Sequence, residues 1–139
     1  MDTIWGTSVA IDGLGILIRG PSGAGKSDLA LRLIDGGAML ISDDQTELSR
    51  EGNRLIARAP DTIRGRLEVR GIGIVTVPAA ARAPLVLVVD LVPPEQVSRM
   101  PNPGRWRQDG VEVPLIVLAP FEASAVPKLR LAVRRVVGE

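Results

Sequence analysis

The sequence predicts an α/β fold of the P-loop-containing kind, in which a mixed sheet is combined with few helices. A glycine-rich segment that fits the phosphate-loop pattern stands between an apolar strand-like run and a helical one. Strand-like patterns also outnumber helical patterns along the chain. With 139 residues, of which 45% are hydrophobic, the chain has the size of one domain with a substantial core. We therefore expect a single domain over residues 1–139.

The opening elements lead into the glycine-rich segment. Residues 7–11 alternate weakly between apolar and polar, Asp12-Gly13 has the composition of a hairpin turn, and residues 15–18 form an apolar strand. Residues 27–35 then carry apolar side chains at helical spacing, and the pair Gly36-Gly37 ends that helix. Strand, loop and helix thus follow one another in the order that a phosphate-binding loop requires.

The middle of the chain is rich in predicted strands. A short apolar strand covers residues 38–41, and the runs 45–49 and 54–59 flank a turn, which predicts a second hairpin. Residues 67–77 alternate around two glycines until a proline stops the pattern.

The last part of the chain contains the strongest strand and a closing helix. Residues 85–89 are an uninterrupted aliphatic run that ends in Asp90, as expected of a buried strand. We expect a loop over residues 93–107, because three prolines and other turn signals fall there. Residues 111–118 contain a proline, which predicts two short strands or an edge strand. Residues 124–137 are predicted to be helical, with a proline in the first turn.

The glycine-rich segment satisfies the phosphate-loop pattern in full. Its glycines let the backbone curl around an anion with the N–H groups pointing inward. The lysine of the pattern reaches the β- and γ-phosphates, the following serine offers its hydroxyl to Mg²⁺, and the helix N-terminus faces the phosphates. The sequence therefore predicts ATP and Mg²⁺ as cofactors. The predicted nucleotide-binding residues are Gly20, Pro21, Ser22, Gly23, Ala24, Gly25, Lys26 and Ser27.

Composition argues against several classes of function. The 17 basic and 16 acidic residues give a net charge of about +1, so a nucleic-acid partner is not indicated. The chain contains no cysteine, which removes disulfides, thiol catalysis and zinc–thiolate sites from consideration. No leader-like start and no apolar run of about 18 residues occurs, so we expect no membrane partner and a cytoplasmic location.

Phosphoryl transfer also needs a metal ligand and a group that orients or deprotonates the acceptor. The candidates are Asp43-Asp44, Glu68 and Asp90. Adjacent carboxylates point to different sides, so one of the pair Asp43-Asp44 can hold a structural partner while the other faces the nucleotide. Asp90 follows an aliphatic strand, where an aspartate is either associated with a metal or an ordinary loop cap.

Three segments together resemble the catalytic domain of HPr kinase/phosphorylase. They are the phosphate loop, the run Leu40-Ile41-Ser42-Asp43-Asp44, and the run Leu67-Glu68-Val69-Arg70-Gly71-Ile72-Gly73-Ile74. The third run is the most specific of them, because phosphate loops are widespread. The resemblance covers roughly residues 5–100. It implies a P-loop kinase fold of the phosphoenolpyruvate carboxykinase-like type.

The resemblance also implies a function and roles for individual residues. Members of the family phosphorylate a serine on the phosphocarrier protein HPr, remove that phosphate by phosphorolysis, regulate phosphotransferase-system metabolism and form hexamers. By resemblance, Lys26 stabilises the transferring phosphoryl group, Asp44 takes or returns the serine proton, and Arg99 is a later catalytic arginine. Ser27 and Glu68 would hold the metal. An HPr-like carrier is thus the implied partner, and a homo-oligomer the implied assembly.

The sequence also departs from the family pattern. Trp5-Gly6 stands where the family has a His-Gly pair. We expect a short form that resembles only the C-terminal catalytic domain of the family. The family's C-terminal loop linked to dephosphorylation and to HPr binding is replaced by residues 119–125. The resemblance therefore supports the kinase direction and leaves phosphorolysis open. Two other hypotheses remain: an ATP-binding regulatory module that has lost catalysis, and a kinase for a small molecule.

Overall fold

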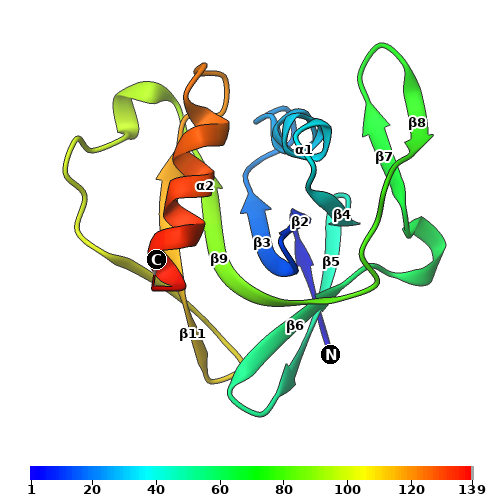
Figure 1. The fold of residues 1–139 in the computed structure, drawn as a ribbon, viewed down its shortest axis with the longest axis horizontal. Helices are drawn as coiled ribbons and strands as arrows, with labels where there is room; N and C mark the ends of the chain where they lie inside the picture. Colours follow the sequence, from blue (N-terminus) through cyan, green and yellow to red (C-terminus); the bar gives the residue numbers. More distant parts are fainter. Residues whose placement is uncertain (139) are drawn as a thin grey trace.

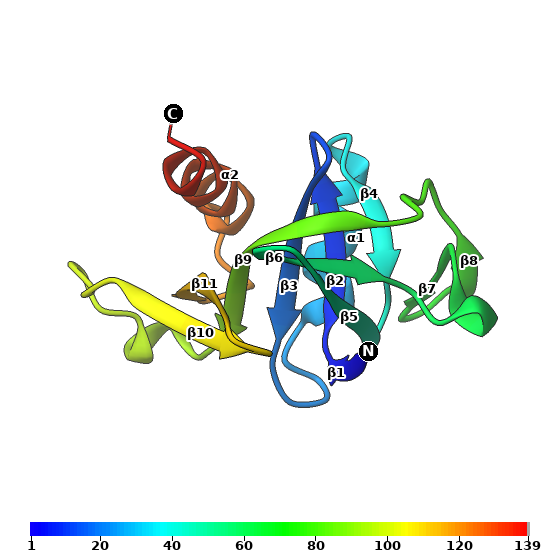
Figure 2. The same ribbon diagram turned by 90° about the horizontal axis from the view of Figure 1, so that it is seen from below.

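The computed structural model describes residues 1–138, which form a strongly curled mixed sheet, a separate hairpin and two α-helices. Figure 1 and Figure 2 show both helices lying against the large sheet, and the hairpin β7–β8 standing at one side. The elements are β1 (Asp2–Trp5), β2 (Thr7–Ile11), β3 (Leu14–Arg19), α1 (Lys26–Asp35), β4 (Met39–Ser42), β5 (Gln45–Glu51), β6 (Arg54–Arg58), the 3-10 turn η1 (Asp61–Ile63), β7 (Arg66–Val69), β8 (Gly73–Thr76), β9 (Ala83–Leu91), the 3-10 turn η2 (Pro94–Gln96), β10 (Gly104–Gln108), β11 (Val111–Leu118) and α2 (Ala125–Val136).

Strand β9 connects the parts of the large sheet. The main path runs β1-β5-β6-β9-β3-β2-β4, and β11 joins β9 and carries β10 at its outer side. The start of β9 pairs antiparallel with β6, whereas its later residues pair in parallel with β3 and β11. The register places Ile18 beside Val89, and Leu118 beside Leu91. Strands β3, β9 and β11 therefore end at the same edge of the sheet, and the loops that follow them gather there (Figure 1).

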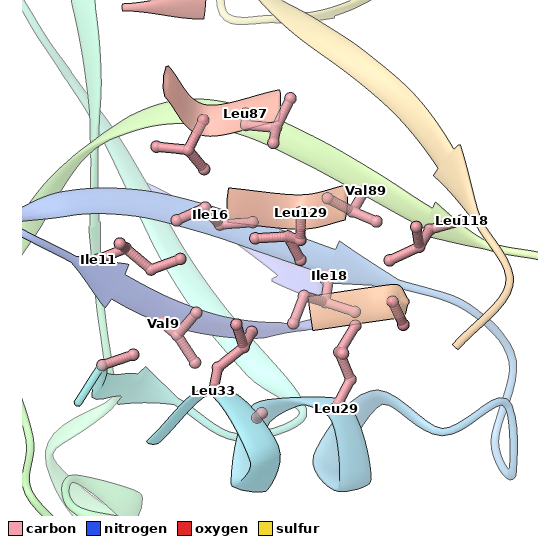
Figure 3. Close-up of a cluster of buried hydrophobic side chains, with 14 of the residues drawn as sticks. Val9, Ile11, Ile16, Ile18, Leu29, Leu33, Leu87, Val89, Leu118 and Leu129 are labelled. Carbon is pink, nitrogen blue, oxygen red and sulfur yellow. The ribbon is translucent and has the colours of Figure 1, made fainter. Parts of the chain in front are cut away.

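The central strands are buried on both faces, which explains their continuous aliphatic sequences. Ile16 and Ile18 of β3 pack toward the helices, whereas Leu17 belongs to a second cluster on the opposite face. Each large aliphatic side chain that becomes fully buried contributes about 1.5–3 kcal/mol. Figure 3 shows the helix-side cluster, in which the labelled residues are Val9, Ile11, Ile16, Ile18, Leu29, Leu33, Leu87, Val89, Leu118 and Leu129.

Both helices cover the same face of the sheet with an apolar stripe. Helix α1 buries Leu29 and Leu33, which lie four residues apart, and helix α2 buries Leu129 and Val133 at the same spacing. Helix α1 ends at Asp35 and is capped by Gly36, whose backbone N–H donates to carbonyls of the last turn. This packing fixes the N-terminus of α1, where the glycine-rich segment ends, against the central strands. No helix within residues 1–138 is both long enough and apolar enough to cross a membrane.

Most predicted elements are confirmed. The opening hairpin, the strand before the glycine-rich segment, the two helices, the hairpin β5–β6 and the buried strand β9 all lie within two residues of their predicted ends. The stretch 67–77 folds as the hairpin β7–β8, whose turn contains Gly71 with φ of 89°. The mixed sheet of the predicted fold class is also confirmed.

Near the end of the chain one prediction is wrong, one is confirmed in part, and one strand was not predicted. Residues 93–107 are not a loop throughout, because β10 begins at Gly104 and pairs with β11. Residues 111–118 form one strand rather than two, and the edge-strand alternative holds for its first half: Pro114 pairs only with β10, and pairing with β9 begins at Leu115, after the proline. Strand β1 pairs with β5 ahead of the predicted opening hairpin.

Candidate active site

The glycine-rich segment is a curled loop between β3 and α1. Gly23 and Gly25 adopt positive φ angles of 83° and 102°, which L-residues with a Cβ rarely adopt. The backbone N–H of Ala24 donates to the carbonyl of Pro21 at 3.0 Å, which closes the turn. Helix α1 begins directly afterwards at Lys26, so its unpaired N–H groups and the positive end of its dipole lie at the loop. This is the geometry of an anion-binding site.

Lys26 brings a positive charge to the same place. Its Nζ donates to the carbonyl of Gly20 at 2.6 Å and to that of Pro21 at 3.2 Å. The side chain therefore lies back along the loop rather than out in solvent. It also lines the cavity described below, so an anion in the loop would meet this ammonium group.

Asp43 is a buried carboxylate that joins three elements. Its Oδ1 accepts hydrogen bonds from Thr7 Oγ1 at 3.0 Å and from Ser27 Oγ at 2.8 Å. Its Oδ2 accepts a hydrogen bond from the backbone N–H of Glu68 at 3.0 Å. These partners come from β2, α1 and β7, respectively. Asp43 thus holds the serine of the phosphate loop and the strand that carries Glu68 in fixed positions.

Asp44 faces the other way, as expected for adjacent carboxylates. The residue is exposed and lines the same cavity as Lys26. Its φ of 66° lies in the left-handed region, which aspartate tolerates better than most residues. The backbone is held on both sides: its N–H donates to Thr7 Oγ1 at 3.1 Å, and its carbonyl accepts from the N–H of Gly6 at 2.8 Å. The carboxylate therefore projects from a well-fixed backbone.

A cavity of about 550 Å³ collects most of the predicted site residues. Lys26, Ser27, Asp44 and Glu68 all line it, and Arg70 from the turn after β7 lies on its wall. One cavity thus offers an anion cradle, three carboxylates, since Asp28 also lines it, and two cations. Such a set can neutralise phosphate oxygens at one end and accept a proton at the other.

The residues at this cavity fit a magnesium ion. Mg²⁺ prefers oxygen ligands and usually takes one or two from the protein, with the rest from water and substrate phosphates. Ser27 offers a hydroxyl and Glu68 a carboxylate, and both face the cavity beside the phosphate loop. Asp43 orients the Ser27 hydroxyl through the 2.8 Å hydrogen bond and positions the backbone of Glu68.

Asp90 has a different role from the other candidate acids. It accepts two hydrogen bonds from the Arg19 guanidinium, at 2.8 Å and 2.9 Å. These hydrogen bonds raise the pKa of Arg19, although partial burial opposes the shift, so the guanidinium stays charged. Arg19 also lies over the ring of Trp106, with its Cζ 5.4 Å from the centroid. The pair fastens the ends of β3 and β9 next to Gly20, which is a structural role.

The comparisons with known proteins agree with this geometry. A family model described as HPr Serine kinase C-terminal domain matches residues 1–98. The chain belongs to this family. The HPr kinase/phosphorylase of Mycoplasmopsis pulmonis is 36% identical over 143 residues, which cover 88% of this chain and 46% of that protein. The HPr kinase/phosphorylase of Clostridium acetobutylicum is 49% identical over 76 residues, covering 55% of this chain and 25% of that protein.

A solved structure extends the similarity over nearly the whole chain. The HPr(Ser) kinase/phosphatase from Coxiella burnetii matches with a TM-score of 0.84 and 30% identity, covering 97% of this chain and 89% of that one. This match confirms the fold of the HPr kinase catalytic domain. The chain spans less than half of the length of the two curated HPr kinase/phosphorylases named above.

Two residues singled out by the HPr kinase resemblance, Trp5 and Arg99, do not line the cavity. Arg99 is exposed in the segment between η2 and β10, and it does not line the cavity that holds Lys26. Figure 1 shows this segment on the opposite side of the molecule from the hairpin β7–β8. Trp5 is 67% exposed and pairs with Gln45, directly after Asp44. The backbone of Trp5 thus lies beside the residue that follows Asp44, and the indole is largely open to solvent.

Sequence reasoning missed two residues of the site. Thr7 bonds both Asp43 and the backbone of Asp44, but a threonine in a weakly alternating strand gives no signal of such a role. Phe121 lies over the phosphate loop from the segment before α2, and a Cβ built on Gly25 would come within 2.8 Å of its Cζ. Phe121 is the single phenylalanine of the chain, which was the one available hint.

Proposed function

We propose that this chain is an ATP-dependent protein serine kinase whose acceptor is the phosphocarrier protein HPr or a homologue. In this proposal it regulates carbon metabolism and the phosphotransferase system. The observation that carries it is the cavity in which the phosphate loop, Asp44 and Glu68 face one another. Membership of the HPr serine kinase family supports the choice of acceptor.

The proposed chemistry is an in-line transfer of the γ-phosphoryl group. The backbone N–H groups of the loop and Lys26 hold the phosphates and neutralise their oxygens. Asp44 accepts the hydroxyl proton of the acceptor serine while the Oγ of that serine bonds to the γ-phosphorus. The bond between the γ-phosphorus and the β,γ-bridging oxygen breaks, which releases ADP. Mg²⁺, held by Ser27 and Glu68, supplies further charge neutralisation when bound.

The test is transfer of label from γ-labelled ATP, with Mg²⁺, to a purified HPr-like carrier. We expect label on the carrier with the native protein, none with Asp44→Asn, and none on a carrier whose acceptor serine is replaced by alanine. Label that appears only as free phosphate would contradict the proposal. Release of pyrophosphate from the phosphorylated carrier, upon addition of inorganic phosphate, would separately establish the phosphorylase direction.

A regulatory module that binds ATP without catalysis is the second candidate. The observations that favour it are the exposed Trp5 in place of the family's histidine and the position of Arg99 outside the cavity. Tight ATP binding without label on the carrier would favour this candidate over the kinase.

We also propose that the protein acts in the cytoplasm, where ATP is available, and as a homo-oligomer, a hexamer by resemblance. Ile72 and Ile74 of the hairpin β7–β8 support the assembly, because they are 77% and 72% exposed and large apolar side chains favour burial. Light scattering coupled to gel filtration measures the assembly directly. A monomer at micromolar concentration would contradict it.

A further inference from the structure

A second cavity, of about 450 Å³, lies on the other side of the phosphate loop. Its walls come from the three loops that follow β3, β9 and β11, and these loops gather at one end of the molecule (Figure 1). The carboxyl ends of neighbouring parallel strands are where α/β proteins commonly bind ligands. None of the residues assigned above to Mg²⁺ or to proton transfer lines this cavity.

The second cavity is continuous with the phosphate site. Ser22, Gly23 and Phe121 line both cavities, so only the crest of the loop separates them. The Phe121 ring stands over Gly25, as its 2.8 Å approach to a Cβ built there indicates. A ligand whose phosphates occupy the loop could therefore extend past Phe121 into the second cavity.

The lining has the chemistry of a slot for a flat, apolar group. Four prolines contribute to it, and proline has a fixed φ, an apolar ring and no backbone N–H to offer an anion. Phe121 and aliphatic side chains such as Val92 complete the walls. The one charged residue in the lining is Glu122, a carboxylate whose Oε1 accepts a hydrogen bond from Lys128 Nζ at 3.2 Å. A phosphate would find few donors here. The prolines are Pro21, Pro93, Pro94 and Pro120.

We propose that this slot binds the purine base of the nucleotide, with Phe121 stacked on the base between the two cavities. The inference rests on the proposed function, because it takes the phosphate loop to hold the triphosphate. It adds the residues that distinguish a nucleotide from a bare polyphosphate. Stacking of a base on an aromatic side chain is strong enough to show in binding constants.

The experiment compares ATP with inorganic tripolyphosphate, which carries the same chain of phosphates without a base or sugar. Calorimetric titrations in the presence of Mg²⁺ give the dissociation constant of each. We expect Phe121→Ala to weaken ATP binding roughly 10-fold or more and to leave tripolyphosphate binding within about twofold. Val92→Trp, which fills the slot without a change in charge, should act in the same direction. Leu131→Ala is the matched control, because Leu131 is a 56% exposed apolar side chain outside both cavities.

The outcomes separate the two proposals. A native protein that binds neither ATP nor tripolyphosphate defeats the proposed function itself. Native binding of both with equal affinity, or equal weakening of both ligands by Phe121→Ala, overturns the base slot alone. Unchanged ATP binding in both variants, together with weaker binding of the HPr-like carrier, would assign the slot to the acceptor protein instead and also overturns the inference.

Discussion

Two adjacent aspartates take opposite roles at the site, and the backbone decides which does which. Asp43 turns inward and accepts three hydrogen bonds, whereas Asp44, with φ of 66°, turns its carboxylate to the cavity. The sequence was sufficient to predict that the pair would be divided in this way. The inward partner Thr7 could not be predicted, because it comes from a strand that meets Asp43 only through the tertiary fold.

The Asp43→Asn variant should lose stability. An amide presents only one oxygen, so at least one of the three donors that meet Asp43 would lose its partner. We expect a loss of about 1–3 kcal/mol in the free energy of unfolding, measured by urea denaturation. The same substitution at Asp44 is the matched control and should change stability by less than about 0.5 kcal/mol, because that residue is exposed and asparagine tolerates a positive φ. Equal effects at the two positions would contradict the assignment of Asp43 as the structural acid.

The Asp44→Asn variant should separate binding from transfer. The phosphate loop is untouched, so the dissociation constant for ATP should stay within about threefold. The rate of transfer to the carrier should fall at least about 100-fold, as expected when a general base is removed. Single-turnover kinetics with saturating ATP measures this rate. Full activity in the variant would refute the role of Asp44 as the base.

At the scale of elements, the phosphate loop depends on glycines for two different reasons. Gly23 has a positive φ and open space around it, so Gly23→Ala should cost only the conformational penalty of about 1–2 kcal/mol. Gly25 has a positive φ and also lies against Phe121. Gly25→Ala should therefore cost more, about 2–4 kcal/mol in thermal or urea unfolding.

A double variant separates the two contributions at Gly25. In Gly25→Ala combined with Phe121→Ala the contact with the ring is gone while the strained φ remains. The free energy of unfolding lost through Gly25→Ala should thus be smaller in the Phe121→Ala background than in the native protein. No recovery would mean that the ring does not press on this part of the loop.

Elements with a strong local pattern were predictable, and elements that depend on partners were not. Helix α1 repeats its apolar residues at helical spacing and ends at two glycines, so its ends could be read closely. The pairing of strand β11 could not be predicted in full. Pro114 is tolerated because it pairs only with β10, and the second neighbour, β9, is reached only from Leu115 onward. Strand β10 has no strand-like pattern of its own in the sequence. Its extended conformation depends on pairing with β11, which only the tertiary fold provides.

At the scale of the whole molecule, ligand binding and stability should be linked. A ligand that binds only the folded chain stabilises it by about 2.7 kcal/mol at a concentration of 100 times its dissociation constant. For a chain of this size that corresponds to a rise in melting temperature of roughly 5–10 °C. We expect this shift with ATP and Mg²⁺ by differential scanning fluorimetry, and a much smaller one for Lys26→Ala. An equal rise in melting temperature in the native protein and in Lys26→Ala would mean that the nucleotide binds at a site other than the phosphate loop.

The pairing of β3 with β9 sets an order of events during synthesis. Arg19, at the end of the strand before the phosphate loop, meets Asp90 from 71 residues further along the chain. A ribosome therefore releases the complete glycine-rich motif well before the strand that braces it. A nascent chain that stops short of β9 would contain every residue of the motif and still lack the braced loop that holds triphosphate. Ribosome-stalled chains of increasing length can be tested for binding to immobilised ATP. We expect binding only once β9 and β11 have emerged, so that nucleotide binding indicates that these strands have paired with β3.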